Sequence, residues 1–561
     1  MPPSPEGELN MNQTMIAVFG IVISLGQQPS APNKPAARTP TPDLRIDAGA
    51  IRGLVVGDKK DVHVYKGIPY AAPPVGERRW KAPEPVGAWQ GVRDCFEFGA
   101  ACPQKVAAIF SSIPDLAIRA PFSEDCLFLN VWTPAERKSE KLPVLYWIHG
   151  GGFVMGAASQ PLYDGEELAR LGCVVVSINY RLGLFGFLAH PALSQESTEK
   201  ASGNYGLLDQ IEGLRWVKRN ISAFGGDPDH VAIFGESAGG MSVLCLMVAP
   251  QAKGLFHAAI AQSAAGMNLA RLREAHSGQD TAESAGQRFI AACGVGASAD
   301  AAPLRKIDAK SLVQSGPSEA PPGGPLRLKP LSLMLGPIVD GHVIPDGPDA
   351  LFGAGRQHGV PMIIGNTKHE MSLFLLGARM PADEAAYLKK LKEDFGDFAE
   401  PIAKAYPAAD AKQFRSTIIQ LTSDLSFVSE TRRIARAHAA VGQKSFRYQF
   451  SRGTKRGFLQ SLGAHHGSEL SFLFQRPAGR DDESEMRISR DMGHYWINFA
   501  ATGDPNGKGV PAWPAYRTDT EETLDFGDEI KVLKDDRTNQ LDVIEKVLQA
   551  KQNGAAKPAG K

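Results

Sequence analysis

The sequence predicts an α/β protein with a large, mostly parallel central sheet flanked by helices. Four short apolar runs without strict alternation are typical of strands buried on both faces of such a sheet; they cover residues 142–148, 173–180, 231–234 and 362–365. Residues 207–220, between the second and third runs, have the largely helical apolar spacing expected of a crossover helix. The 58 glycines and 40 prolines favour many short elements and shaped loops over a helical bundle.

The N-terminal segment is predicted to lie outside this fold. Residues 15–25 form an apolar run that is too short to span a bilayer but suits the core of a signal peptide. Residues 1–14 contain no Lys or Arg, so the basic segment that usually precedes such a core is missing. We expect residues 1–26 to be a signal peptide or leader and the protein to be secreted or periplasmic; a buried strand or a disordered leader is the alternative. Residues 27–42 are Pro-rich and resemble a linker.

Composition excludes several classes of function. The chain has 61 Lys and Arg against 61 Asp and Glu, whereas a nucleic-acid or polyanion binder needs a basic excess. We therefore expect no nucleic-acid partner, and we also expect no stable membrane insertion. The six cysteines contain no C-x-x-C pair and no Cys/His cluster with metal-ligand spacing, so we expect no metal site built on them.

Three later segments differ from the strand and helix pattern. Residues 315–330 are rich in Pro and Gly and should form a long surface loop. Residues 383–441 are helical in composition, and insertions of this kind after sheet strands usually build the walls of a pocket. Residues 550–561 are rich in Lys, Ala and Gly, and we expect a flexible tail.

The most specific motif is G-x-S-x-G at residues 235–239. It directly follows the apolar run 231–234 and precedes a helix-like stretch at 240–248. A serine on such a tight strand-to-helix turn needs small residues two positions before and after it, because the strand and the helix approach closely. The helix N-terminus also favours negative charge that develops beside Ser237. In this context the motif predicts that Ser237 is a nucleophile.

A second motif, His149-Gly150-Gly151-Gly152-Phe153, ends the run 142–148. Three consecutive glycines expose backbone N–H groups, which is what an oxyanion hole requires. A plain flexible loop is the alternative interpretation. The position of the cluster after a buried strand, and upstream of the serine motif, favours the oxyanion loop.

Around these two motifs the sequence resembles the type-B carboxylesterase family, the cholinesterase-like branch of the α/β-hydrolases. The resemblance covers roughly residues 43–530. It rests on long blocks, namely GIPYA at 67–71, PPVG at 73–76, SEDCLFLNV at 123–131, GNYGLLDQ at 203–210, FGGDP at 224–228, TGDPN at 502–506 and WPAY at 513–516. It implies an α/β-hydrolase fold, a Ser-His-Glu triad and hydrolysis of carboxylic esters through an acyl-enzyme on Ser237.

The resemblance also selects the other two members of the triad. The family places its base directly before Gly-x-Glu, which selects His466 over its neighbour His465. The acid follows a strand that ends in Gly, which selects Glu370; the competing carboxylate is Asp340, in a segment that resembles a structural part of the family. Met371 stands after Glu370 where the family often has Gly, a departure at this turn. The order Ser237, Glu370, His466 is the order that this fold requires.

Further roles are implied by the same resemblance. The oxyanion would be bound by the backbone N–H groups of Gly151, Gly152 and Ala238. Ser263 would support the acid, although a simple turn serine is a nearly equal alternative, and Glu236 would be a pocket carboxylate or merely structural. Scaffold ion pairs would join Arg79 to Glu124 and Arg181 to Asp209. Cys102 and Cys126 match the family's first disulfide, with Cys95 as a competitor and Cys293 without an obvious mate.

Departures from the cholinesterases bear on the substrate. The segment between Cys102 and Cys126 contains no Trp, and the cholinesterases carry one there that stacks on a quaternary ammonium. The segment after Ser263 lacks their aromatic acyl-pocket residues, so a roomier or differently shaped pocket is expected. Four basic residues could rim the pocket or simply be solvated: Arg271, Arg273, Arg327 and Lys329.

We therefore expect residues 43–549 to form one catalytic domain of a serine carboxylesterase that acts on a small-molecule ester without metal or cofactor, as a monomer or homodimer. A lipase-like member that acts on long-chain or lipid esters is the first alternative. A non-catalytic adhesion member of the same fold is the second. Such members usually lose the nucleophile or the base, whereas all three candidate triad residues are present here.

Overall fold

The structure is a computed structural model. It describes residues 38–106, 111, 113–135, 141–265, 267–276, 279–296, 300–317, 326, 328, 335–453, 458–479, 481–534 and 537–555. The chain divides into two units, Met1–Thr39 and Pro40–Lys561, and the account below concerns the second. The predicted leader 1–26, most of the linker 27–42 and most of the loop 315–330 lie outside the described residues.

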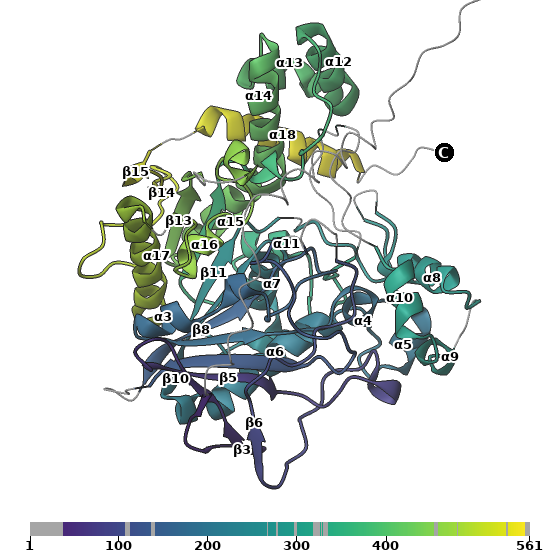
Figure 1. The fold of residues 1–561 in the computed structure, drawn as a ribbon. Coiled ribbons are helices and arrows are strands. Elements are labelled where there is room, and N and C mark those ends of the chain that lie inside the picture. Colours follow the sequence, from purple (N-terminus) through teal and green to yellow (C-terminus); the bar gives the residue numbers. More distant parts are fainter. Residues whose placement is uncertain are drawn as a thin grey trace, which may run out of the picture. The chain divides into compact units, whose positions relative to one another are not determined.

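A twelve-stranded sheet forms the centre of the second unit (Figure 1). Its order is β1-β4-β5-β7-β9-β8-β10-β11-β12-β13-β14-β15, and a small sheet has the order β2-β3-β6. The strands are β1 (Thr39–Pro40), β2 (Leu44–Ile46), β3 (Gly49–Arg52), β4 (Leu54–Val56), β5 (Val62–Pro69), β6 (Val92–Asp94), β7 (Phe128–Pro134), β8 (Leu142–Ile148), β9 (Val174–Ile178), β10 (Gly226–Glu236), β11 (Ala258–Gln262), β12 (Met362–Thr367), β13 (Ser445–Phe450), β14 (Thr523–Phe526) and β15 (Ile530–Leu533).

The part of the large sheet from β9 to β14 is parallel, and antiparallel strands extend it on both sides. Glu236 at the end of β10 is in register with Gln262 at the end of β11, which in turn is in register with Gly365 on β12. Side chains that follow these strands therefore meet at one edge, where ligands of open α/β sheets bind. The predicted α/β class with a mostly parallel sheet is confirmed.

Helices cover both faces of the sheet. The α-helices are α3 (Glu166–Arg170), α4 (Gly183–Phe187), α5 (Pro191–Glu196), α6 (Tyr205–Asn220), α7 (Ala238–Val248), α8 (Ala282–Ala292), α9 (Ala302–Arg305), α10 (Ala309–Ser315), α11 (Pro348–Gly353), α12 (Glu384–Phe395), α13 (Ala399–Ala405), α14 (Ala411–Ser423), α15 (Ser429–Ala440), α16 (Leu470–Leu473), α17 (Glu483–Thr502) and α18 (Thr538–Ala555). Short 3₁₀ turns are η1 (Gly76–Arg78), η2 (Pro161–Tyr163), η3 (Ile221–Phe224), η4 (Pro250–Ala252), η5 (Glu370–Ser372), η6 (Gly396–Phe398) and η8 (Phe458–Leu462), while η7 (Asp424–Val428) is a π-helical turn.

The parallel strands are buried on both faces, which explains their unbroken apolar runs. Along β8, Tyr146 and Ile148 belong to one hydrophobic core, which includes α6 and α7. Leu145 and Trp147 belong to a second core on the other face, which includes α3 and α17. This packing fixes the strands between two helical layers, so the side chains at their carboxyl ends rest on a rigid base.

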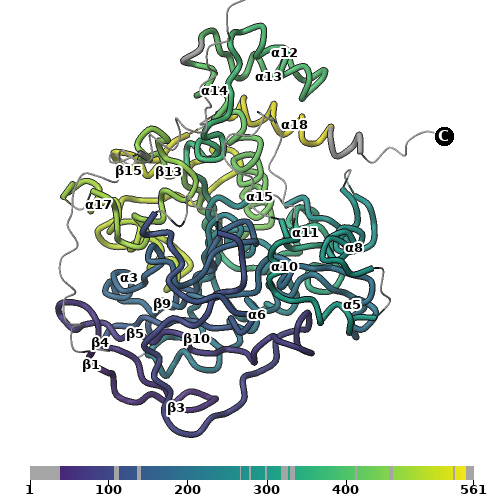
Figure 2. Tube along the Cα trace, turned by 45° about the vertical axis from the view of Figure 1, so that its right-hand side comes forward, coloured from purple at the N-terminus to yellow at the C-terminus, as the bar shows by residue number. Residues whose placement is uncertain are grey.

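The helical segment predicted at 383–441 contains α12, α13, α14 and α15. It has its own hydrophobic core, to which the C-terminal helix α18 contributes Ile544 and Val547. Helices α12, α13 and α14 stand together beyond the sheet with α18 close to them, in both views (Figures 1 and 2). Helix α18 continues to Ala555, beyond the predicted domain end at residue 549.

Two scaffold ion pairs lie where the resemblance places them. Arg79 and Glu124 are joined through two guanidinium nitrogens and both carboxylate oxygens. Arg181 and Asp209 form a fully buried pair, with Nη2 2.7 Å from Oδ1. Across the part of the chain that the structure describes, no helix combines the length and the apolar character that a membrane span needs.

Candidate active site

Ser237 lies between β10 and α7 on a strained turn. Its φ of 57° and ψ of −120° are rarely adopted by a residue with a side chain. The glycines on either side are required by close packing: a Cβ on Gly235 would lie 2.5 Å from the carbonyl carbon of Gly239, and a Cβ on Gly239 would lie 2.0 Å from the carbonyl oxygen of Ile148. The tight strand-to-helix turn that the motif predicts is therefore present, and it places Ser237 at the carboxyl edge of the sheet.

The glycine loop after β8 packs directly against this elbow. A Cβ on Gly150 would lie 2.7 Å from the carbonyl oxygen of Glu236 and 3.2 Å from Cβ of Ser237, so only glycine fits there. Gly151 and Gly152 have φ of 104° and 60°, which bends the loop around the serine. Ala238 is the first residue of α7, so its N–H has no acceptor within the helix. The structure thus places the predicted oxyanion loop and the start of α7 beside Ser237.

His149 holds this loop as a neutral side chain. Its ring stacks on Tyr180 with centroids 4.5 Å apart, and the Tyr180 hydroxyl donates a 2.8 Å hydrogen bond to the His149 carbonyl. Complete burial lowers the pKa of His149 to about 4, against the weaker effect of its hydrogen bond with the Gly150 carbonyl. His149 is therefore neutral at neutral pH and brings no charge to the predicted oxyanion loop.

Glu370 lies in η5, just after β12, and is fully buried. Its Oε1 accepts hydrogen bonds from the Ser263 hydroxyl at 2.6 Å and from the Thr367 N–H at 2.7 Å. Its Oε2 lies 2.5 Å from Nδ1 of His466. The competing carboxylate, Asp340, instead accepts the backbone N–H groups of its own turn at residues 342–344. The structure thus brings Glu370, and not Asp340, to the histidine.

His466 and His465 have different surroundings. His466 faces Glu370, whereas Nδ1 of His465 contacts the backbone carbonyl of His466 at 2.9 Å. Burial is the first cause that lowers the pKa of His465. His465 also forms a parallel backbone bridge with His369, the residue before the acid. The backbone of His465 therefore links the segment of the histidines to the segment of Glu370. Of the two histidines, His466 is the one whose side chain reaches the carboxylate.

Three buried carboxylates surround His466. Glu370 contacts Nδ1, Glu236 Oε1 lies 3.1 Å from Nε2, and Glu469 lies close enough to act through its charge. Burial by itself lowers the pKa of His466, but the charges of Glu236 and Glu370, the hydrogen bond to Glu370 and the charge of Glu469 outweigh it and raise the pKa to about 9. The imidazolium is therefore the favoured form in the resting site.

The hydrogen bond between the serine and the histidine is not made in this state. Within the described residues, Nε2 of His466 has no hydrogen-bond acceptor, and the polar group found beside it is the Glu236 carboxylate. Catalytic hydrogen bonds of this kind often form only when substrate is bound. Within the same residues, no group of three or more His, Cys, Asp or Glu side chains is arranged to hold a metal ion.

Sequence reasoning missed two aromatic residues and the environment of one carboxylate. Phe374 and Phe427 have ring centroids 5.1 and 5.0 Å from the His466 ring, and 6.4 Å from each other. Glu469 is fully buried and accepts a 3.3 Å hydrogen bond from Gln262. Burial, followed by the charges of Glu236 and Glu370, raises the pKa of Glu469 to about 8. Only Glu469 had a local signal, because it lies three residues after His466.

The basic residues proposed at the rim are engaged elsewhere or lie outside the described chain. Arg271 pairs with Asp346 at 2.8 Å, and Arg273 pairs with Glu283 at 3.2 Å. Arg327 and Lys329 lie outside the described residues. The interpretation of Arg271 and Arg273 as paired surface charges is the better supported one.

Cys102 and Cys126 are both present as free, buried thiols. They are neighbours, since a hydrogen bond with Cys102 is the first cause that raises the pKa of Cys126, followed by burial. Cys102 also accepts a 3.3 Å hydrogen bond from the Leu182 N–H. Cys95 and Cys293 are free as well. The structure therefore brings the predicted disulfide partners together without a bond between them.

Comparison with known proteins agrees with this geometry. The sequence pattern of the Carboxylesterase family matches residues 40–544. The para-nitrobenzyl esterase of Bacillus subtilis is 36% identical over 500 residues, which is 87% of this chain and 95% of that protein. The fumonisin B1 esterase of Sphingopyxis macrogoltabida is 34% identical over 510 residues, which is 88% of either chain.

The fold of a solved PNB esterase superposes with a TM-score of 0.73 at 34% identity, covering 90% of this chain and 99% of that one. A thermophilic PNB esterase gives a TM-score of 0.72 at 32% identity with the same coverage. These structures share the α/β-hydrolase fold, and the relatives are esterases by name. The chain therefore belongs to the carboxylesterase family and is a carboxylic ester hydrolase.

Proposed function

We propose that Ser237 is the nucleophile of this esterase, His466 its general base and Glu370 the acid that orients the base. One observation carries the assignment: Glu370 binds Nδ1 of His466 at 2.5 Å while Ser263 and Thr367 saturate its other oxygen. A carboxylate held on one side by two donors has a fixed direction toward the imidazole. Nε2 of His466 also lies 3.1 Å from Glu236, which directly precedes Ser237 on the strand-to-helix turn.

Acylation follows from the properties of these groups. A serine hydroxyl is a weak nucleophile, so the neutral imidazole takes its proton as Oγ of Ser237 attacks the ester carbonyl. Glu370 stabilises the imidazolium that results. The tetrahedral intermediate then collapses, the bond to the alcohol oxygen breaks, and Nε2 of His466 donates its proton to the departing alcohol. An acyl group remains bound to Ser237.

Deacylation repeats the same steps with water. His466 takes a proton from water as the water oxygen attacks the acyl carbon. His466 then returns a proton to Oγ of Ser237 as the carboxylic acid leaves. In both half-reactions the oxyanion is bound by N–H groups of Gly151, Gly152 and Ala238. Loss of one such donor typically costs about 3 kcal/mol of transition-state stabilisation.

The substrate class we propose is small esters of an aromatic or bulky apolar alcohol. The base must protonate the leaving alcohol, so the groups beside His466 contact that part of the substrate. Phe374 and Phe427 both pack against its ring, and Phe374 is 38% exposed, so its ring also faces outward. The para-nitrobenzyl esterase is named for an ester of an aromatic alcohol, and we propose the same kind of substrate for this chain.

Hydrolysis of matched acetates tests this proposal. Benzyl, p-nitrobenzyl and ethyl acetate differ only in the alcohol, so kcat/KM should rise with its apolar area. A series of p-nitrophenyl esters from acetate to palmitate varies the acyl chain instead. A preference for long, aggregated esters would favour the lipase-like alternative, and equal rates on all three acetates would contradict the proposed role of the two phenylalanines.

Substitution separates the roles of the two neighbouring histidines. Ser237→Ala and His466→Ala should each lower kcat by roughly four to six orders of magnitude. His465→Ala should keep most of the activity per correctly folded site, counted by organophosphate labelling of Ser237. Activity in His466→Ala together with its loss in His465→Ala would overturn the base assignment.

We also propose that the protein is exported, that Cys102 and Cys126 form a disulfide in an oxidising compartment, and that the enzyme is a monomer or homodimer. The apolar run at 15–25 supports export, and the contact between the two buried thiols supports their pairing. Mass spectrometry of protein from cells and culture medium, with thiol counting before and after reduction, tests the first two. Light scattering of the purified protein tests the third.

A further inference from the structure

A π-helical turn lies next to the active site. Helix α14 and helix α15 form one continuous run that is interrupted by η7, Asp424–Val428, in which every residue is buried. A π-helical turn widens the backbone locally and is less favourable than an α-helical one, and such turns occur frequently at functional sites. The residues that this π-helical turn holds in place are therefore candidates for a functional role.

This turn contacts both the proposed base and the segment of the proposed acid. Phe427, within η7, packs its ring 5.0 Å from that of His466. Ser423, directly before η7, accepts a 3.1 Å hydrogen bond from the N–H of Met371, the residue after Glu370. A shift of η7 would consequently move one side of the imidazole pocket and the turn that carries the carboxylate together.

Asp424 at the start of the turn is fully buried and is held by two long-range partners. Its Oδ1 accepts a 2.9 Å hydrogen bond from Nη1 of Arg537, and its Oδ2 accepts one of 2.9 Å from the Tyr406 hydroxyl. Nη2 of Arg537 also donates to Gln449 on β13 at 2.9 Å. A buried carboxylate needs such partners. Because Arg537 contacts both Asp424 and Gln449, it connects the π-helical turn to the central sheet.

The backbone of Arg537 is itself unusual. Its φ of 67° lies in the left-handed region, which glycine adopts without strain and other residues rarely adopt. The position just before α18 would therefore favour glycine on backbone grounds alone. An arginine at this position accepts that backbone strain, and its contacts include those with Asp424 and Gln449.

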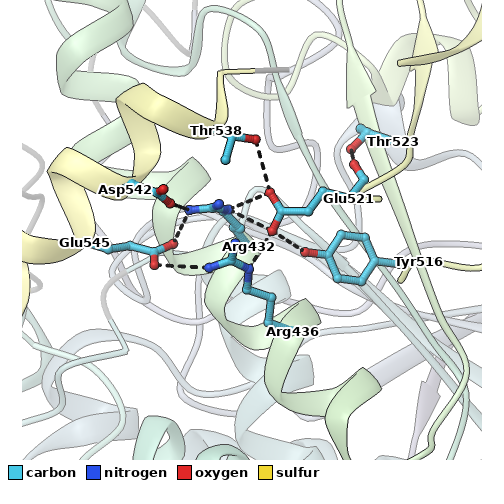
Figure 3. A network of polar contacts seen from close by, with 8 residues as sticks. All are labelled: Arg432, Arg436, Tyr516, Glu521, Thr523, Thr538, Asp542 and Glu545. Carbon is cyan, nitrogen blue, oxygen red and sulfur yellow. Dashed lines mark hydrogen bonds and ion pairs between the residues drawn. The ribbon is translucent and has the colours of Figure 1, made fainter. Parts of the chain in front are cut away.

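Helix α18 begins directly after Arg537. A network of ion pairs holds it against helix α15 (Figure 3). Arg432 of α15 contacts Glu521, Asp542 and Glu545, and Arg436 reaches Glu521 and Glu545 as well. The Arg432 side chain is fully buried. This network fixes α18 and so fixes the point from which Arg537 extends.

We propose that Arg537 is a positioning residue for the active site: through Asp424 it fixes the π-helical turn, which holds the His466 ring through Phe427 and the Glu370 turn through Ser423. The proposal rests on the proposed roles of His466 and Glu370. It connects the C-terminal helix α18 to the active site through Arg537, the residue directly before that helix.

The test compares Arg537→Gln with Arg433→Gln. Arg433 lies on α15 and pairs with Asp349 at 2.7 Å, so its substitution also removes an ion pair of this helical region but leaves Asp424 untouched. We measure kcat and KM for p-nitrobenzyl acetate well below the melting temperature, and count competent sites by organophosphate labelling. Arg537→Gln should lower kcat per labelled site about tenfold, since small displacements of catalytic groups have effects of this order or larger, with KM changed less than about twofold. Arg433→Gln should leave kcat unchanged.

Two further variants separate positioning from folding. Arg537→Lys keeps the charge and should recover part of kcat. Asp424→Asn combined with Arg537→Gln should be no slower than the slower single variant, because both act through one contact. An unchanged kcat per labelled site in Arg537→Gln, or an equal loss in Arg433→Gln, would overturn the proposal. Failure of the triad assignment is distinct, because it would appear as activity in His466→Ala.

Discussion

His466 Nε2 lies 3.1 Å from Oε1 of Glu236, the residue that directly precedes the nucleophile. Its other nitrogen, Nδ1, lies 2.5 Å from Glu370. The imidazole is thus held between two carboxylates, and the one next to Ser237 occupies the side from which the serine proton must arrive. An enzyme that uses His466 as a base must first remove a proton from this site, because only the neutral ring accepts one.

The first prediction concerns the pH dependence of catalysis. Because its pKa is raised to about 9, His466 becomes neutral only at alkaline pH, so kcat/KM should rise with pH along a limb centred well above the ordinary value of 6.5. Glu236→Gln removes a negative charge beside Nε2, which destabilises the imidazolium and lowers its pKa. The limb should move to lower pH by about one pH unit or more.

The measurement is a kcat/KM profile from pH 5 to 10 on a substrate whose leaving group does not titrate. The exposed Glu274 provides a matched control, since Glu274→Gln should leave the limb in place. A limb that stays fixed or moves to higher pH in Glu236→Gln would show that Glu236 does not set the protonation of His466.

The second prediction concerns stability and Glu469. Its folded-state pKa of about 8 lies above the ordinary value of 4.5, so the native state holds a proton that the unfolded chain releases between these values. The stability contributed by this proton is fully present below pH 4.5 and is lost as the pH rises through about 8. Glu469→Gln cannot lose a proton there, so its melting temperature should fall less between pH 5 and 8 than that of the wild type.

Thermal unfolding followed by circular dichroism at several pH values provides this comparison. The glutamine can still accept the hydrogen bond that Gln262 donates to Oε1 of Glu469. His466 has a raised pKa as well, but Glu469 is the last of the causes that raise it, so the wild type and the variant share most of its contribution and the difference between their curves reports mainly Glu469. Parallel curves would refute the buried protonated state.

The sequence predicted those parts of the site that need fixed residue types at fixed spacing. The turn around Ser237 and the loop at Gly150 admit only glycine at certain positions because backbone lies within 3 Å of the missing Cβ, so their motifs are visible in the sequence. The fold class followed from the same logic, since a strand buried on both faces must be apolar throughout. The proposed triad order followed from the family resemblance, and the structure brings Glu370 and His466 together.

Contacts between distant segments could not be predicted in this way. Phe427 contacts His466 from within a π-helical turn, and a phenylalanine in a helix has the same sequence signal whether it faces a core or a site. The pairing of Arg537 with Asp424 spans 113 residues and depends on where α18 docks. The 3.1 Å approach of Glu236 to Nε2 of His466 joins two segments that are far apart in the sequence, and no local spacing encodes it.

The third prediction concerns the geometry of the elbow. A Cβ at position 239 would lie 2.0 Å from the Ile148 carbonyl oxygen, so Gly239→Ala must push the helix α7 away from β8. Moving backbone of either the strand or the helix costs free energy of folding. We therefore expect loss of organophosphate labelling along with a large loss of soluble protein. Gly87→Ala is the control, because no atom lies within 4 Å of a Cβ there. Normal labelling in Gly239→Ala would contradict the close approach of strand and helix.

The fourth prediction concerns Ser263, whose hydroxyl donates a 2.6 Å hydrogen bond to Glu370 in a fully buried position. Ser263→Ala leaves one oxygen of this carboxylate with the Thr367 N–H as its remaining donor. A hydrogen bond to a charged group contributes about 1.5–3 kcal/mol, so the free energy of unfolding should fall by about that amount. Because Glu370 also loses a restraint on its direction, kcat should fall more than KM changes.

Denaturant unfolding and steady-state kinetics check both effects, with the exposed Ser416→Ala as the control. If Ser263 were only a turn residue, the stability would fall while kcat per labelled site stayed the same, and its proposed support of the acid would be wrong.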